Sequence, residues 1–311
     1  MPSDSPLLLL GSSSQDIVGR LETDLQPGTS NPARIRVSYG GVARNVAENL
    51  ARLGQPVKLI SVVGRDRPGD ELLEYTASAG VDVSAVLRTD LYPTGFYMGV
   101  LDPRARLRFA VDDMRVMSEL TPEVLQQNQA LFENASLVFV DGNLSEASLK
   151  VAVSLAKKAK IPVCADPAST VLAGRLKPHL GKLHLVTPNV TEAVALTGQS
   201  FESSDPGAAL EDARALLALG VDIALITLAE FGVVYATHET SGHIPAIQTP
   251  ILDPTGAGDA LTAAVLFGLV NDMELDDAVR LGVSAASLTL RHPGTVYPEL
   301  TLEKLYEQLV I

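Results

Sequence analysis

Short apolar runs alternate with longer amphipathic stretches over most of the chain. From about residue 120, apolar runs bounded by turn-forming residues recur at Leu137–Val140, Ile161–Ala165, Leu183–Val186 and Ile223–Thr227. Helical periodicity over residues 146–160 and 206–219 separates them, and two earlier runs, at 7–10 and 57–63, extend the pattern. Strands that alternate with helices form a mostly parallel sheet covered on both faces. The pattern therefore predicts one α/β domain over residues 1–311.

Two other segments have a different pattern. Residues 94–101 and 106–111 read as strands joined by Asp-Pro-Arg-Ala at 102–105, which is typical of a hairpin. Residues 34–39 alternate between polar and apolar side chains, as in a half-exposed strand. Hairpins do not belong in an all-parallel sheet. We therefore expect residues 18–39 and 94–111 to form a small antiparallel sheet that acts as a lid.

Residues 253–259, with the sequence Asp-Pro-Thr-Gly-Ala-Gly-Asp, form a small-residue turn before an apolar helix that we expect over 260–270. The backbone N–H groups of Gly256, Ala257 and Gly258 are uncovered, and the first N–H groups of a helix bind anions. Asp259 would lie beside this anion site, and the positive end of the helix would keep it ionised at neutral pH. The alternative is a glycine-rich turn with Asp259 as an N-cap.

Polar residues recur where the predicted strands end. They are Asp16, Asp141, Asp166, Asn189, Glu192, Thr227 and Asp253. Acids that gather at one sheet edge repel each other unless a cation or a hydroxylated ligand shares the site. Gly40 and Gly41 would let a ligand approach the backbone, and Asn45 would offer a donor and an acceptor to sugar hydroxyls or would cap a helix. The pattern hints at a Mg²⁺-assisted sugar or nucleoside site, although polar residues are common at strand ends.

Composition narrows the function classes. The net charge of −13 argues against a nucleic-acid groove or an anionic membrane face. Cys164 is the only cysteine, which suits a reducing cytoplasm, and it reads as a core residue. The five histidines lack metal-site spacing and read as surface or loop residues. Neither a dinucleotide-binding Gly-x-Gly-x-x-Gly after the first strand nor a P-loop occurs.

Three motifs together resemble the ribokinase-like (PfkB) carbohydrate kinase family. Residues 253–259 resemble its C-terminal signature. Residues 40–47, Gly-Gly-Val-Ala-Arg-Asn-Val-Ala, with the Gly-Arg-Asp at 64–66, resemble its N-terminal signature. Residues 187–192, Thr-Pro-Asn-Val-Thr-Glu, resemble its Asn-x-x-Glu motif. The motifs stand in family order and span nearly the whole chain.

The resemblance implies a three-layer α/β/α sandwich and an ATP-dependent phosphotransferase with an alcohol acceptor. Asp259 would be the catalytic base, and the amides of residues 256–258 would form the anion hole. The residues implied to hold the substrate are Asp16, Gly40, Gly41, Asn45 and Asp166. Those implied for the nucleotide side are Asn189, Glu192, Thr227 and Gly232, with Mg²⁺ held at Glu192 through water. Asp253 and Thr255 stand where family members often bind a monovalent cation, here K⁺. Ala229 replaces a glycine of the nucleotide loop.

Within the family, residues 40–54 resemble pseudouridine kinases most, which implies phosphorylation of the 5′-hydroxyl of pseudouridine. Residues 141–144 and 165–169 also resemble that subgroup. A ribokinase-type sugar kinase and a kinase of inosine or adenosine are the alternatives. A non-catalytic nucleoside-binding regulator is a third. We expect a cytoplasmic homodimer formed through the lid, with no nucleic-acid or membrane partner.

Overall fold

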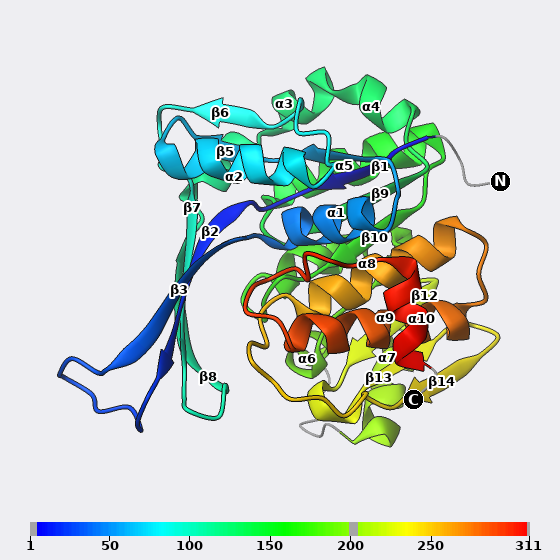
Figure 1. Ribbon diagram of the computed structural model, residues 1–311. Helices are drawn as coiled ribbons and strands as arrows, with labels where there is room; N and C mark the ends of the chain where they lie inside the picture. The colour runs from blue at the N-terminus through cyan, green and yellow to red at the C-terminus, as the bar shows by residue number, and fades with distance from the viewer. Residues whose placement is uncertain (1–4, 199–204, 310–311) are drawn as a thin grey trace.

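The computed structural model describes residues 5–198 and 205–309. Its centre is an eight-stranded sheet with the order β14-β13-β12-β11-β10-β9-β1-β4 (Figure 1). The six strands from β12 to β4 run parallel, and β13 and β14 pair antiparallel at one edge. The strands are β1 (Leu7–Leu10), β4 (Val57–Ile60), β9 (Leu137–Asp141), β10 (Val163–Asp166), β11 (Leu185–Val186), β12 (Ile223–Thr227), β13 (Val233–Ala236) and β14 (Ser241–Ile244).

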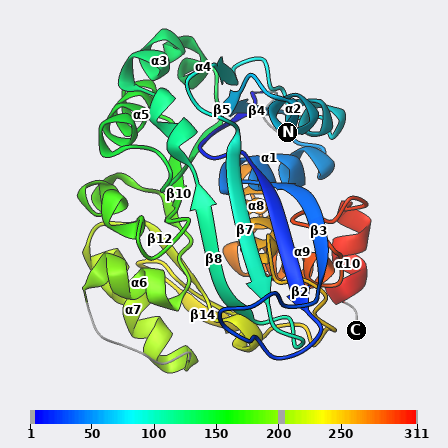
Figure 2. The same cartoon turned by 90° about the vertical axis from the view of Figure 1, so that its left-hand side faces the viewer.

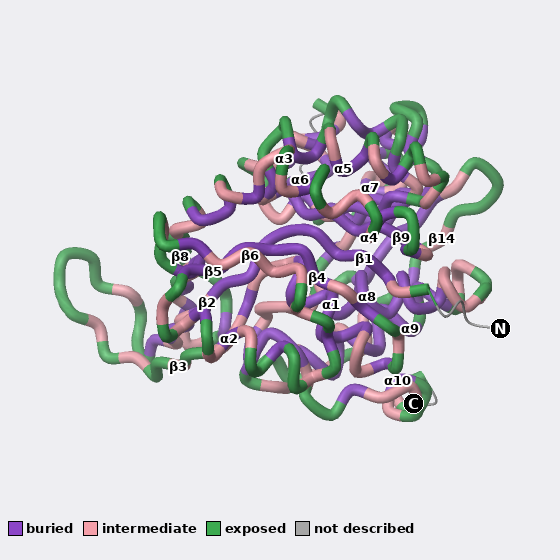
Figure 3. Tube along the Cα trace, turned by 90° about the horizontal axis from the view of Figure 1, so that it is seen from above, coloured by how far each residue is buried: buried purple, intermediate pink, exposed green. Residues whose placement is uncertain are grey.

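Helices cover both faces of this sheet, because side chains alternate between the faces along each strand. In β1, Leu8 and Leu10 join the core under one helical layer, and Leu7 and Leu9 join the core under the other. The first layer contains α3 (Pro122–Gln127), α4 (Gln129–Glu133), α5 (Glu146–Ala159), α6 (Val190–Thr197) and α7 (Pro206–Ala218). The second contains α1 (Val42–Arg52), α8 (Ala257–Val270), α9 (Leu275–Leu290) and α10 (Leu302–Leu309). Figure 3 shows the buried residues running through the middle of the molecule. The predicted three-layer α/β/α architecture is confirmed.

A four-stranded sheet stands beside this body, with the order β3-β2-β7-β8 (Figures 1 and 2). It consists of β2 (Ser14–Leu21), β3 (Ala33–Gly40), β7 (Gly95–Leu101) and β8 (Leu107–Asp113). The two hairpin pairs are antiparallel, and β2 pairs with β7 in parallel. The remaining elements are β5 (Val62–Gly64), β6 (Leu87–Thr89), α2 (Arg67–Ser78), and the 3₁₀ helices η1 (Arg115–Glu119), η2 (Ala173–Lys182) and η3 (Ala229–Phe231).

Three local expectations were wrong. The run at 57–63 is two strands, because Ser61 interrupts it and donates a 2.6 Å hydrogen bond to the Gly11 carbonyl. The helix after the glycine turn begins at Ala257 rather than at residue 260, so Asp259 lies in its first turn. His179 is not a surface residue, since only 6% of it is exposed. Within the described ranges, no helix has both the length and the apolar character to cross a membrane.

Candidate active site

The turn before α8 is shaped by Gly256. Its φ is 81°, in the left-handed region, and a Cβ at this position would lie 1.9 Å from the Thr295 carbonyl oxygen. Only glycine fits such a position without a backbone shift. The helix then begins at Ala257, and Ala257 and Gly258 line a cavity. First-turn amides have no partner inside the helix and lie at its positive end. The turn can therefore hold an anion at the mouth of that cavity.

Asp259 is held from the side by Asn45, in the first turn of α1. The Asn45 amide nitrogen donates to Asp259 Oδ2 at 2.6 Å. Arg44 donates to the amide oxygen of Asn45, which fixes the direction of this amide. Arg44 is fully buried and also donates to the carbonyl oxygen of Gly40 at 3.0 Å. Arg44 was not predicted from the sequence as a site residue, although a charged residue beside the two glycines was the available signal.

The pKa of Asp259 is raised to about 7, chiefly because burial disfavours the charged carboxylate. The hydrogen bond from Asn45 and the charge of Arg44 lower this pKa, while Asp141 and Asp16 raise it further. The helix end was expected to keep Asp259 ionised at neutral pH. Burial instead raises its pKa to about 7, so this carboxyl is only partly ionised there.

Asp16 lies near Asp259, at the start of the four-stranded sheet. It is buried, and Ser14 Oγ donates to its Oδ1 at 2.7 Å. Burial raises the pKa of Asp16 to about 6, against the lowering effects of the Ser14 hydrogen bond and of Arg44 and Arg36. A Cβ at Gly40 would lie 2.0 Å from Asp16 Oδ2, so a side chain there would displace the carboxylate. The structure thus brings Asp16, Gly40 and Asn45 to one place.

Asp141 does not face this site as a free carboxylate. It is fully buried, and it accepts hydrogen bonds from the Ser12 N–H and Oγ, both at 2.8 Å, and from the N–H groups of Ala43 and Asn143 at 3.1 and 2.9 Å. These contacts join the loop after β1, the start of α1 and the loop after β9. Asp141 therefore fixes the loops around the site.

Asp166 and Glu192 form an acidic side of the site with Asp259. Asn189 caps α6 by accepting from the Glu192 N–H at 3.0 Å, and the Glu192 carboxylate accepts from the Asn189 N–H at 2.9 Å. Burial raises the pKa of both Asp166 and Glu192, and the charges of Glu192 and Asp259 raise that of Asp166 further. Acids that oppose one another's ionisation favour a shared cation, and carboxylate oxygens suit Mg²⁺. Among the described residues, no group of three or more Asp, Glu, His or Cys side chains could hold a metal ion by itself.

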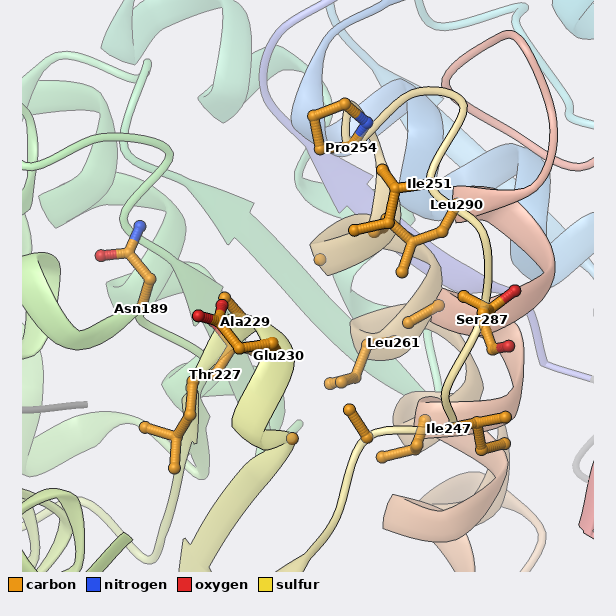
Figure 4. Close-up of a pocket in the computed structure, with 18 of the residues that line it drawn as sticks. Asn189, Thr227, Ala229, Glu230, Ile247, Ile251, Pro254, Leu261, Ser287 and Leu290 are labelled. Carbon is orange, nitrogen blue, oxygen red and sulfur yellow. The ribbon is translucent and has the colours of Figure 1, made fainter. Parts of the chain in front are cut away.

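A cavity of about 510 Å³ opens beside the glycine turn. Figure 4 shows Asn189 and Thr227 on one side of it, and Leu261 and Leu290 on the other. Gly232, Ala257 and Gly258 also line it, so Asn189, Thr227 and Gly232 lie around one space, whereas Glu192, also expected on the nucleotide side, does not line it. Ala229 adopts a φ of 51°, which explains why glycine would also suit this position.

Asp253 is fully buried beneath the glycine turn, where Arg36 of β3 forms an ion pair with it. The Thr255 N–H donates to the other oxygen of Asp253 at 3.0 Å. Arg36 thus balances the charge of Asp253, although Asp253 Oδ2 and Arg36 Nη2 make no hydrogen bond among the described residues. A monovalent cation at Asp253 would have to compete with this ion pair. No sequence signal linked these two residues, which are far apart in the chain.

The chain matches the model of the pfkB family carbohydrate kinases over residues 6–302, and it belongs to that family. It is thus an ATP-dependent kinase of a sugar or a nucleoside. It is 31% identical to a pseudouridine kinase of Escherichia coli (strain K12), with 95% of this chain and 94% of the relative covered. It is 28% identical to a guanosine-inosine kinase of Exiguobacterium acetylicum, with 90% and 93% covered. Its fold is similar to that of Arabidopsis thaliana ribokinase complexed with ribose and ATP, with a TM-score of 0.85, 23% identity and 99% of each chain covered.

Proposed function

We propose that this kinase transfers the γ-phosphoryl group of ATP to the 5′-hydroxyl of pseudouridine. The observation that carries the proposal is Asp259 in the first turn of α8, hydrogen-bonded to Asn45 and beside Ala257 and Gly258, which line the 510 Å³ cavity. The similarity to a pseudouridine kinase supports the choice of acceptor. The similarity to a guanosine-inosine kinase makes a purine nucleoside the second candidate, and ribose is the third.

Different residues of the site would bind the nucleotide, the sugar and the metal ion and accept the proton. The 510 Å³ cavity takes the nucleotide, with its γ-phosphate directed at the amides of Ala257 and Gly258. Phosphoryl transfer depends mostly on positioning and on stabilising charge on the transferring oxygens. Asp16 and Asn45 hold the sugar, and Asp259 orients the attacking hydroxyl and accepts its proton. Asp166 and Glu192 would hold Mg²⁺ through water, and the ion would neutralise phosphate charge.

The four-stranded sheet has two roles in this proposal. Its inner face, which carries Asp16, closes over the substrate as a lid. Its outer face is apolar across the strands, with Ile35 64%, Val111 58% and Phe109 46% exposed. In the strand register, Val37, Ile17, Met98 and Val111 form one row of this face. An exposed apolar surface of this extent suits a second copy of the chain. We therefore propose a homodimer through this sheet, located in the cytoplasm.

The proposal predicts a specific product. The purified protein is incubated with MgATP and, in turn, with pseudouridine, uridine, inosine, adenosine and ribose, and ADP release is measured. Phosphorus–proton NMR then locates the phosphate. We expect the highest kcat/KM for pseudouridine, with the phosphate on the 5′ oxygen. A clear preference for inosine or ribose would refute the acceptor, and ADP release equal to the acceptor-free rate would refute the kinase assignment.

A further inference from the structure

A second cavity, of about 810 Å³, lies at the end of β8. It is lined from five segments: the end of β8, η1, the loop after β9, the loop after β10 and the start of η2. None of its lining residues lines the 510 Å³ cavity. Its size is that of a pocket for a small organic ligand, and the phosphoryl-transfer roles described above do not use it.

The cavity adjoins the position proposed for the sugar. Asn143, which lines it, donates through Nδ2 to Ser12 Oγ at 3.1 Å, in the loop that leads into β2. Asp112, which also lines it, lies in the same row of the sheet as Asp16, because Asp16 pairs with Tyr97 and Tyr97 pairs with Asp112. Neighbouring strands are ~4.8 Å apart, so the two acids lie ~10 Å apart across the sheet. In the view of Figure 2, β8 is the edge strand of this sheet on the side of β10.

We propose that this cavity is the subsite for the base of a nucleoside, a conclusion that rests on the proposed function. An acceptor held by its ribose at Asp16 would extend along the row past Tyr97 towards Asp112. A free pentose would leave the cavity empty. The subsite therefore favours nucleosides over ribose as acceptors.

The polar groups of the cavity indicate which bases suit it. Arg175 uses Nη1 to hold the carbonyl oxygens of Gly142, Asn143 and Leu144 at 3.0–3.3 Å. Its Nε and Nη2 have no hydrogen-bond partner among the described residues, and the same holds for Asn143 Oδ1 and the Asp112 carboxylate. These groups offer donors from Arg175 and acceptors from the other two.

Such a set matches a base edge that carries both carbonyl oxygens and ring N–H groups. A pyrimidine-2,4-dione and a 6-oxopurine have that edge, whereas adenine has no carbonyl oxygen. Met114 and Leu172 supply apolar surface in the same cavity. The subsite is thus expected to accept pseudouridine, uridine and inosine, and to reject adenosine.

The test compares nucleosides with ribose in the wild type and in Asp112→Ala and Asn143→Ala. Asp112 is exposed, so its replacement is not expected to disturb folding. Removing one hydrogen bond to the base is expected to lower kcat/KM for pseudouridine about 10-fold, and up to ~100-fold where the lost partner is charged. Because Asn143 also donates a hydrogen bond to Ser12, the decisive readout is the ratio of kcat/KM for pseudouridine to kcat/KM for ribose. We expect kcat/KM for ribose to change less than twofold in Asp112→Ala.

Arg108→Ala is the matched control. Arg108 lies on the same strand and the same face, four residues and ~13 Å from Asp112, and it does not line the cavity. We expect it to leave both acceptors unaffected. Equal losses for ribose and pseudouridine in Asp112→Ala, or no loss for either, would overturn the base subsite. A wild type that phosphorylates ribose but no nucleoside would also overturn the base subsite, and the protein would then be a sugar kinase. A wild type that phosphorylates no acceptor would refute the proposed function itself.

Discussion

Replacing Asn45 with alanine is expected to move the acid limb of the pH–rate profile to higher pH. Asp259 must be ionised to accept a proton, so activity should rise with pH through its pKa of about 7. The Asn45 amide lowers this pKa by donating to Asp259 Oδ2. Without that donor, the charged form loses a stabilising contact that the neutral form does not need. The pKa of Asp259 should therefore increase.

The size of the shift follows from the hydrogen bond. A hydrogen bond to a charged group contributes about 1.5–3 kcal/mol, and one pKa unit corresponds to about 1.4 kcal/mol. The pKa should therefore rise by about 1–2 units. At pH 7, about half of Asp259 is ionised in the wild type, and roughly 1–10% would be ionised in Asn45→Ala. Ionisation alone then lowers kcat/KM about 5- to 50-fold at pH 7, and much of the loss should be recovered near pH 9.

The assay is kcat/KM for pseudouridine between pH 5 and pH 9.5, at constant ionic strength and saturating MgATP. Asn45→Ala is compared with Asn49→Ala, which removes the same side chain one helical turn later. The amide nitrogen of Asn49 donates to the Asn45 carbonyl oxygen at 2.8 Å and does not contact Asp259. We expect the limb to move only in Asn45→Ala. An unchanged limb in that variant, or a wild-type limb below pH 5, would refute this account of the base.

Four other measurements test the site, its stability and the assembly. Asp259→Asn should lower turnover by about 10²–10⁴-fold. Because the pKa of Asp259 is raised to about 7, ionisation of this carboxyl lowers the free energy of unfolding as pH rises above about 4. The full pKa shift corresponds to about 4 kcal/mol, and partial contact with solvent reduces the effect to about 1–2 kcal/mol. In urea unfolding, Asp259→Asn should therefore be more stable than the wild type by this amount at pH 8, and the two should be about equally stable at pH 4. Because Arg36 pairs with Asp253, the wild-type rate should change less than twofold when choline chloride replaces KCl. The rate of Arg36→Met should depend on K⁺, and that of the control Arg34→Met should not. A K⁺ requirement in the wild type would contradict the ion pair. Phe109→Lys should convert the dimer to a monomer in light scattering, whereas a wild type that is monomeric at working concentration would contradict the interface.

Much of the fold could be read from local patterns. The apolar runs of β1 and β9 are long enough to be strands and too short to be helices of a core, and the polar residues that follow them mark the sheet edge where the site lies. The glycine turn could be predicted because one short stretch holds Asp259 and the amides that we propose to bind an anion. Each of these inferences needed only residues that are close in sequence.

The features that could not be predicted from the sequence depend on contacts between residues that are far apart in the chain. Arg36 and Asp253 form a pair only because β3 packs against the glycine turn. The pKa of Asp259 depends on burial within the site and on acids from other strands, so a helix-end argument alone missed the rise of this pKa. The splitting of the run at 57–63 similarly depends on a hydrogen bond from Ser61 to Gly11.

Arg44 explains why the substrate side and the phosphate side of the site keep one geometry although they come from opposite ends of the chain. Its guanidinium donates to the carbonyl oxygen of Gly40, to the amide oxygen of Asn45 and to Thr295 Oγ1. The Thr295 carbonyl in turn lies against Gly256. An arginine presents its donors in a planar fork, so one side chain can fix several segments in one orientation. Asn45, which holds Asp259, is thereby tied to the turn whose amides are proposed to bind the phosphate, and a displacement of either one changes the alignment of both.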